Sequence, residues 1–166
     1  MQHRLTSKCN KMKDKTLKNI RLCCYVALVF CAIWIAIVAN YIISDLRGPN
    51  LPIDWSQHTL AKILTLASYV LGTVAMIVLS IKVVLNILKG IRENMVFPKS
   101  NVKLLLCMAL ADFVYLLGFT NLPILWNDKV VFYLQHTNFV IPFLLFFFAF
   151  MYKVAADAVE ENNLTI

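Results

Sequence analysis

One acidic residue, Asp112, stands inside an otherwise apolar stretch of the chain. An ionised carboxylate surrounded by hydrocarbon is costly unless it is paired or hydrated. Lys82 and Lys153 stand in two other apolar stretches, and their long side chains can either turn toward Asp112 or extend toward a membrane surface. This intramembrane polar cluster could form a buried ion pair, a protonated carboxyl bonded to a hydroxyl, a proton or ion relay, or a regulatory switch.

The residues that usually carry catalysis or bind metals are few and badly placed. His3, His58 and His136 all fall outside the apolar stretches, so no serine–histidine pair can form within a membrane, and no HExxH motif occurs. His58 and His136 could meet across one face, but two imidazoles on loops are a weak metal signal. We therefore predict no enzymatic activity, no cofactor and no metal site.

The cysteines do not indicate a disulfide framework, because their number is five and therefore odd. Cys23 and Cys24 stand where the first apolar stretch begins, a position at which lipidation occurs in other membrane proteins. The alternative is that they are small packing residues.

The elements that must position these residues are membrane helices. Hydrophobic residues make up 60% of the 166 residues, and the mean hydropathy is +0.72. So small a globule cannot bury that excess. Apolar segments about as long as the roughly 20 residues that cross a bilayer lie at about 22–43, 63–88, 104–122 and 138–156. We predict an all-α, integral membrane four-helix bundle that forms a single domain over 1–166.

The start of the fourth segment is ambiguous, because an apolar patch at Val130–Leu134 precedes it. A fourth helix that begins as early as Val130, or a short interfacial helix, would each explain this patch. We predict that Asp112 faces the interior of the bundle, toward the second or fourth helix and within reach of Lys82 or Lys153. Ser68 and Gly72 have a spacing that favours close helix packing, either within the bundle or in a homodimer.

The distribution of basic residues predicts the orientation. Seven lysines and arginines lie in the arm 1–21 and four in the loop 89–103, against three in the two remaining loops. Because cytoplasmic flanks carry the excess of positive charge, we predict a multi-pass cell-membrane protein with both termini, and the tail 157–166, in the cytoplasm. No aromatic or glycine pattern accompanies the lysines of the arm, so we do not expect direct binding of nucleic acid.

The loop and the tail together resemble a known family. Gly90-Ile91, Phe97 and Asn101-Val102-Lys103 lead into the third segment, and the chain ends Glu160-Glu161-Asn162-Asn163-Leu164-Thr165-Ile166. This pattern resembles the bacterial four-span membrane proteins of domain-of-unknown-function family 2975. Pro98 and Asn163 depart from it, since a small polar residue and an aspartate are usual there. The resemblance implies a frequent genetic neighbour, a small helix-turn-helix transcription regulator.

We therefore expect a non-enzymatic membrane regulator whose cytoplasmic face binds a soluble transcription regulator in response to a membrane signal, such as a lipid. The predicted partner-binding residues are Gly90, Phe97, Asn101, Lys103, Glu160, Glu161, Leu164, Thr165 and Ile166. A purely structural role is the alternative for this face. Pro98 would end one helix, Ser100 would cap the next, Asn101 would satisfy exposed amides near that start, and the acidic tail would pair with the basic loop and arm on the same face. A small transporter or a peptide-immunity protein that uses Asp112 is the alternative from another functional class.

Overall fold

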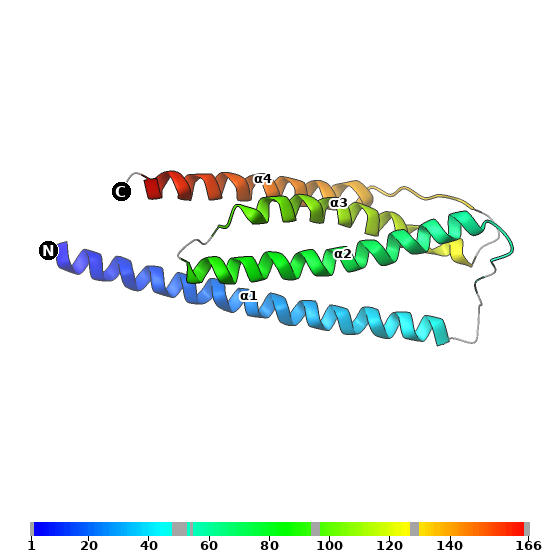
Figure 1. The fold of residues 1–166 in the computed structure, drawn as a ribbon, viewed down its shortest axis with the longest axis horizontal. Helices are drawn as coiled ribbons and strands as arrows, with labels where there is room; N and C mark the ends of the chain where they lie inside the picture. The colour runs from blue at the N-terminus through cyan, green and yellow to red at the C-terminus, as the bar shows by residue number, and fades with distance from the viewer. Residues whose placement is uncertain (1, 48–52, 54, 94–96, 127–129, 165–166) are drawn as a thin grey trace.

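The computed structural model describes residues 2–47, 53, 55–93, 97–126 and 130–164, with side chains described inside 15–40 and 130–161 at the two ends. Its helices run side by side (Figure 1) and are α1 (Gln2–Arg47), α2 (Thr59–Arg92), α3 (Ser100–Thr120), the short 3-10 helix η1 (Leu122–Leu125) and α4 (Thr137–Leu164). In the described ranges, four helices are long and apolar enough to cross a membrane. The prediction of an all-α chain with four candidate spans is confirmed.

The predicted arm and the first predicted span form one continuous helix, α1, of 46 residues. No glycine or proline interrupts the stretch, so nothing in it breaks the helix. At 1.5 Å per residue the helix is roughly 69 Å long, about twice the hydrocarbon thickness of a bilayer. The arm is therefore a helical extension of the first span.

The helices pack in chain order. α2 packs against α3, α3 against α4, and α1 against α2 alone. Successive helices run antiparallel, so α1 begins and α4 ends at the same end of the molecule (Figure 1). We call this end the termini end and the opposite one the loop end.

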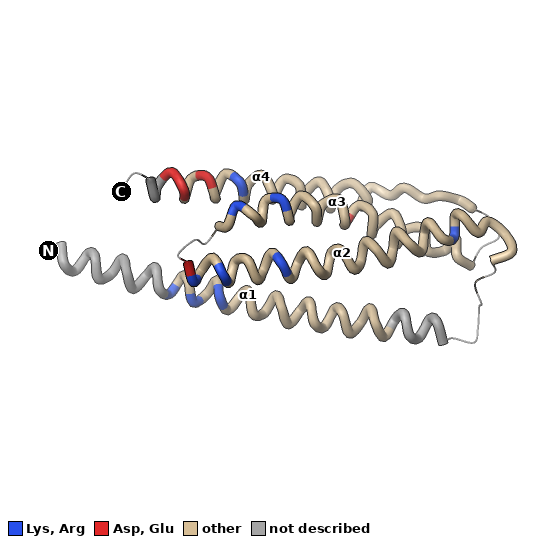
Figure 2. The backbone as a smooth tube through the Cα atoms, viewed as in Figure 1, with Lys and Arg blue, Asp and Glu red and all other residues tan. Residues whose placement is uncertain are grey.

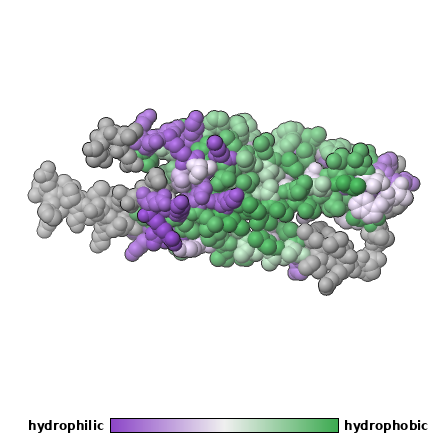
Figure 3. All heavy atoms as spheres, viewed as in Figure 1, coloured by the Kyte–Doolittle hydropathy of each residue, from purple (hydrophilic) through white to green (hydrophobic). Residues whose placement is uncertain are grey.

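The interior of the bundle holds mainly small and polar side chains, and most of the large apolar ones point outward. Ala109, Ala149 and Ala156 are buried, whereas Leu110 and Phe143 are 69% and 67% exposed. Apolar surface covers the middle of the molecule and polar surface gathers at its ends (Figure 3). This arrangement suits a lipid surround, in which helices associate through small residues rather than through burial of large apolar ones.

Two glycines let the backbones of α2 and α3 touch. A Cβ atom on Gly72 would lie 2.6 Å from Tyr115 Cα, and one on Gly118 would lie 2.7 Å from Tyr69 Cα. Both distances are too short for any side chain. The spacing of Ser68 and Gly72 thus serves packing within the chain, and Gly118 is a second contact that the sequence analysis did not single out.

Residues 130–135, ahead of α4, form no helix, so both explanations of the Val130–Leu134 patch are wrong. α4 itself begins at Thr137. Asn121 holds this segment: its Oδ1 accepts a hydrogen bond of 2.7 Å from Tyr133 N, and its Nδ2 donates to Tyr133 O and Leu117 O. The side chain of Asn121 therefore satisfies both the N–H and the carbonyl of Tyr133, which a helix would otherwise have paired.

Candidate functional site

Asp112 lies inside the bundle, as predicted, with a relative exposure of 6%. Its Oδ2 atom is buried and has no hydrogen-bond partner among the described residues. Lys82 and Lys153 are both exposed. No ion pair in the described part of the chain joins either lysine to Asp112. The predicted polar cluster is therefore not brought together.

The register of α2 and α3 explains this separation for Lys82. Gly72 lies level with Tyr115, so in an antiparallel pair Asp112 lies near residue 75 of α2. Lys82 is about seven residues nearer the termini end, which is roughly 10 Å along the helix axis. An exposed lysine there can extend its ammonium group to the membrane surface.

At the termini end, Lys99 joins the segment before α3 to the last turns of α4. Its Nζ atom lies 2.9 Å from Asp157 Oδ1 and also contacts the carboxylate of Glu160. Hydrogen bonds to Glu160 and then to Asp157 raise the pKa of Lys99 above its ordinary value. All three side chains are more than 40% exposed, so solvent and salt screen the contact. We call these three residues the latch.

The segment at the start of α3 also contacts α4 through aromatic rings. Phe97 and Tyr152 meet edge to face, with ring centroids 5.4 Å apart. This geometry is a favourable one for an aromatic pair. The predicted pairing of the acidic tail with the basic loop is present through the ion pairs of Lys99, and Phe97 adds a contact with α4 ahead of the tail.

Asn101 is fully buried and bonds to both neighbouring helices. Its Oδ1 accepts a hydrogen bond of 2.9 Å from Asn86 Nδ2 on α2. Its Nδ2 donates to Val83 O on α2 at 3.2 Å and to Tyr152 Oη on α4 at 3.3 Å. Asn101 therefore links three helices, and the predicted role of satisfying the first amides of α3 is wrong.

The other predicted capping roles need correction as well. The N-cap of α3 is Lys99, whose side chain makes no capping hydrogen bond to the helix, and the hydroxyl of Ser100 accepts a bond of 3.3 Å from Asn86 instead of capping it. α2 already ends at Arg92, well before Pro98, and the C-cap residue Glu93 donates its backbone N–H to the carbonyls of Gly90 and Lys89.

The remaining predicted partner-binding residues lie around the latch. Gly90 is buried near the end of α2, whereas Lys103 and Glu161 are exposed. Lys103 forms no ion pair within the described side chains. Leu164 ends α4. Its side chain, and the whole of Thr165 and Ile166, lie outside the described residues.

Buried polar residues at the loop end were missed or misplaced from the sequence. Lys62, predicted in a loop, belongs to the first turn of α2 and is 1% exposed. Asn138 is fully buried, and its Oδ1 accepts a hydrogen bond of 3.2 Å from Thr120. The signal in the sequence for such buried residues was a polar side chain at the edge of an apolar segment or within it. Asn86, near the termini end, gave the same signal.

In the part of the chain that the structure describes, no group of three or more histidine, cysteine, aspartate or glutamate side chains could hold a metal ion. No family model matches the sequence, and comparison with curated proteins and with solved structures gives no match. The function is therefore argued from the geometry of the latch and of Asp112.

Proposed function

We propose that the protein is a non-enzymatic regulator in the cell membrane, whose cytoplasmic face binds a soluble partner in response to a membrane signal. The latch is the observation that carries the proposal. It ties the acidic end of α4 to Lys99 through exposed ion pairs. Such pairs are individually weak, so a partner that binds one of the two sides more tightly can shift the balance between a closed and an open latch.

The termini end is the proposed cytoplasmic face. Most of the basic residues drawn in Figure 2 lie toward this end. Lys62 is the exception, because it belongs to the first turn of α2. An excess of lysine and arginine beside the ends of membrane spans favours cytoplasmic placement. With four spans, both termini would then lie in the cytoplasm.

The buried contacts of Asn101 provide a route from the membrane to the latch. Tyr152 stands about one and a half helical turns before Asp157 on α4, and its hydroxyl binds Asn101 beside Lys99. A shift of α4 relative to α3 within the bilayer would move Asp157 and Glu160 away from Lys99. The signal would thus act by changing the packing of two helices that hydrogen bonds hold together.

A DNA-binding partner is the form of this proposal that the family resemblance favours. The test is affinity capture from native membranes with a tag at the N-terminus, so that the tail stays free. Wild type should retain one stoichiometric DNA-binding protein, and Lys99→Gln should change the amount captured several-fold because the latch is open. Lys82→Gln, which removes an exposed lysine that has no described ion pair and lies away from the latch, should leave it unchanged.

Deletion of 160–166 completes this test. The deletion should keep membrane abundance near the wild-type level, because the tail buries little hydrocarbon, but it should abolish partner capture. Capture that is equal for all variants, or the absence of any DNA-binding partner, would reject the proposal.

The carboxylate of Asp112 supports a second candidate, a small transporter or a peptide-immunity protein. A buried Oδ2 atom without a described partner could take up a proton or bind a substrate amine. Proton flux into liposomes that hold the purified protein tests this function. Flux that Asp112→Asn abolishes would favour the transporter over the regulator.

A further inference from the structure

Three buried polar atoms in the described part of the chain have no hydrogen-bond partner, and all three lie in the loop-end half of the bundle. They are Thr65 Oγ1, Asp112 Oδ2 and Asn138 Nδ2. Their residues are 4%, 6% and 0% exposed. A buried polar atom that no protein group satisfies is costly, and ordered water is the usual partner of such atoms. This half of the bundle thus offers three atoms to which water can bind.

The three atoms lie at successive depths from the loop end. Gly118 lies level with Tyr69, so Thr65, which comes earlier on α2, is about one turn nearer the loop end. A hydrogen bond from the last residue of α3 places Asn138 at the same end. Asp112 lies about 12 Å further in along α3, at 1.5 Å per residue. The unpartnered atoms therefore extend from the loop end toward the middle of the bundle.

A stripe of hydrogen-bonding side chains on α2 spans the same depths. We call it the polar stripe, and its members are Lys62, Thr65, Tyr69 and Thr73. Their spacing of three or four residues puts them on one face of the helix, and three of the four are buried. Because Gly72 lies level with Tyr115, Thr73 lies within about 3 Å of the level of Asp112. The polar stripe therefore runs from the first turn of α2 to the depth of the carboxylate.

On the other side of Asp112 the helices are almost wholly apolar. From 102 to 111, α3 is apolar apart from one lysine and one cysteine, both of which are exposed. α4 has only apolar side chains from 140 to 151. At this depth α2 adds the half-buried hydroxyl of Ser80 and the exposed Lys82. About 15 Å of mainly apolar packing thus separates Asp112 from the termini end.

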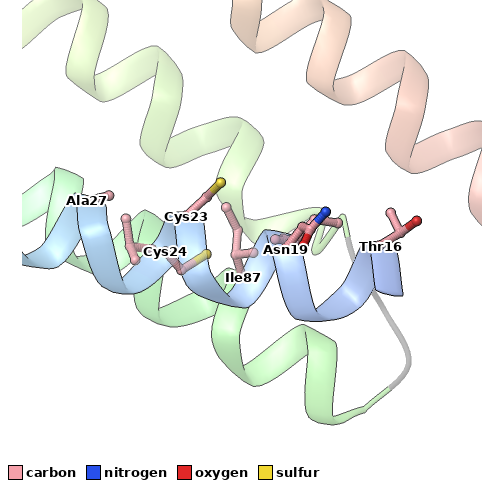
Figure 4. Close-up of a pocket in the computed structure, with 8 residues that line it drawn as sticks. Thr16, Asn19, Cys23, Cys24, Ala27 and Ile87 are labelled. Atoms are coloured by element: carbon pink, nitrogen blue, oxygen red, sulfur yellow. The ribbon is translucent and has the colours of Figure 1, made fainter. Parts of the chain in front are cut away.

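The open groove toward the termini end does not bring water to Asp112 either. It has a volume of about 390 Å³ and lies between α1 and α2 (Figure 4). Apart from Thr16 and Asn19, its lining is apolar or cysteine, and it includes Val84 and Ile87 of α2. Apolar hollows hold water poorly. Val84 also lies roughly 13 Å along α2 from the level of Asp112, and α1 packs on α2 alone within the described ranges.

We propose that the loop-end half of the bundle holds water between α2, α3 and α4, and that this water brings protons to Asp112 from the loop end alone. Carboxylates inside membrane proteins mark proton relays in this way. The titratable side chains beside this depth are Tyr69 of α2 and Tyr115 of α3, whose ring centroids lie 5.9 Å apart. α4 has none from 138 to 151, and Lys62 is the charged member of the polar stripe. Tyrosine hydroxyls keep their protons at neutral pH, so Asp112 is the described group at this depth that takes up a proton.

The inference goes beyond the proposed regulatory function and requires only that the bundle is inserted in a membrane. A carboxylate that is open to one side and sealed from the other takes up protons without passing them across, so it does not support proton transport. In the proposed regulator, the pH on the loop-end side would be the membrane signal. The test below involves no partner, so its failure would leave the binding of a partner at the latch unaffected.

The test is the reactivity of single cysteines toward silver ion, a small cation, in the full chain without its native cysteines. Lipid nanodiscs expose both ends of the bundle to the ion, and alkylation after unfolding counts the thiols that remain. Asp112→Cys should react several-fold faster than Ala109→Cys, because a thiol forms its reactive thiolate only where water reaches it. The two positions lie about one turn apart on α3 and are similarly buried, at 6% and 4%. Equal rates would overturn the proposal.

A second pair of variants tests the end at which water enters. In the Asp112→Cys chain, Thr65→Leu should slow the reaction several-fold, because it replaces a hydroxyl of the polar stripe with a larger apolar group. Ser80→Leu, on the termini side of Asp112, is the matched control and should leave the rate unchanged. Any result other than selective slowing by Thr65→Leu would contradict entry from the loop end. Circular dichroism and a monodisperse elution profile check folding, and Thr73→Cys takes the place of Asp112→Cys in both comparisons if that variant misfolds.

Discussion

The Asn101 side-chain nitrogen donates a hydrogen bond of 3.3 Å to the Tyr152 hydroxyl and thereby joins the first turn of α3 to the C-terminal half of α4. The same amide binds Val83 and Asn86 on α2. A single buried side chain thus fixes the relative positions of three helices at the end of the molecule where the latch lies.

Replacement of Asn101 by alanine should destabilise the protein by about 1–3 kcal/mol, because it leaves Asn86 and the carbonyl of Val83 without their partner. Tyr152→Phe removes one bond of the same amide, so its effect should be about 1 kcal/mol or less. Thermal unfolding in detergent, followed by circular dichroism, measures both. A larger loss for Tyr152→Phe than for Asn101→Ala would contradict the central role of Asn101.

Gly118→Ala should be costly although it adds only one methyl group. The new Cβ atom would meet the backbone of Tyr69, which cannot rotate away. We expect a loss of about 2 kcal/mol or more and a lower yield of folded protein. Ser68→Ala, one residue before Tyr69 on the same helix, shortens a side chain and is the control. Wild-type stability in Gly118→Ala would show that α2 and α3 can separate at little cost.

The latch should respond to salt and to alkaline pH. Because the folded state raises the pKa of Lys99, its stabilising effect is complete below the ordinary pKa of 10.5 and is lost as the pH rises through the raised value. Hydrogen exchange of the amides at 157–161 should speed up a few-fold in molar salt at neutral pH and in Lys99→Gln. Lys103→Gln should exchange like wild type, and insensitivity of these amides to Lys99→Gln would argue against the latch.

Asp112 should tolerate apolar replacement better than its charge suggests. No described lysine pairs with it, so Asp112→Leu strands no buried cation and removes an unpartnered oxygen. We expect Asp112→Leu and Asp112→Asn to unfold at or above the wild-type temperature. A drop of several degrees for both variants would mean that the carboxylate has a stabilising partner in the membrane.

The orientation is tested by cysteine labelling in a background without the native cysteines. Labels at Asn50 and Asp128 should react with a membrane-impermeant reagent in intact cells, and labels at Glu93 and Asn163 should react only after lysis. Reaction at Glu93 in intact cells would reverse the arrangement and move the latch outside.

The spans were predictable because they depend on local composition. A run of some 20 apolar residues specifies a membrane helix whatever its neighbours are. The patch at 130–134 was not predictable, because a short apolar run does not distinguish a helix from an extended segment. Its conformation depends on Asn121, a residue on another element.

The site was predictable only in outline. The opposite charges of tail and loop indicated an attraction, but which lysine forms the pair depends on the three-dimensional arrangement of the segments. Lys99 forms it and Lys103 does not. The burial of Asp112 followed from the cost of exposing a carboxylate to lipid, whereas its distance from Lys82 depends on the contact between Gly72 and Tyr115.

The outward placement of the large apolar side chains determines how freely the chain can change by mutation. Lipid tails adapt to any apolar outline, so exchanges among leucine, valine and phenylalanine on the outer faces should cost little and leave the hydropathy unaltered. Freedom is lost at Gly72 and Gly118, where no side chain fits, at the fully buried Ala149, and at Asn101, where no other side chain offers the same donors and acceptor. Random mutagenesis should therefore find intolerance at a few small or polar positions, and not in the hydrophobic residues that make up most of the protein.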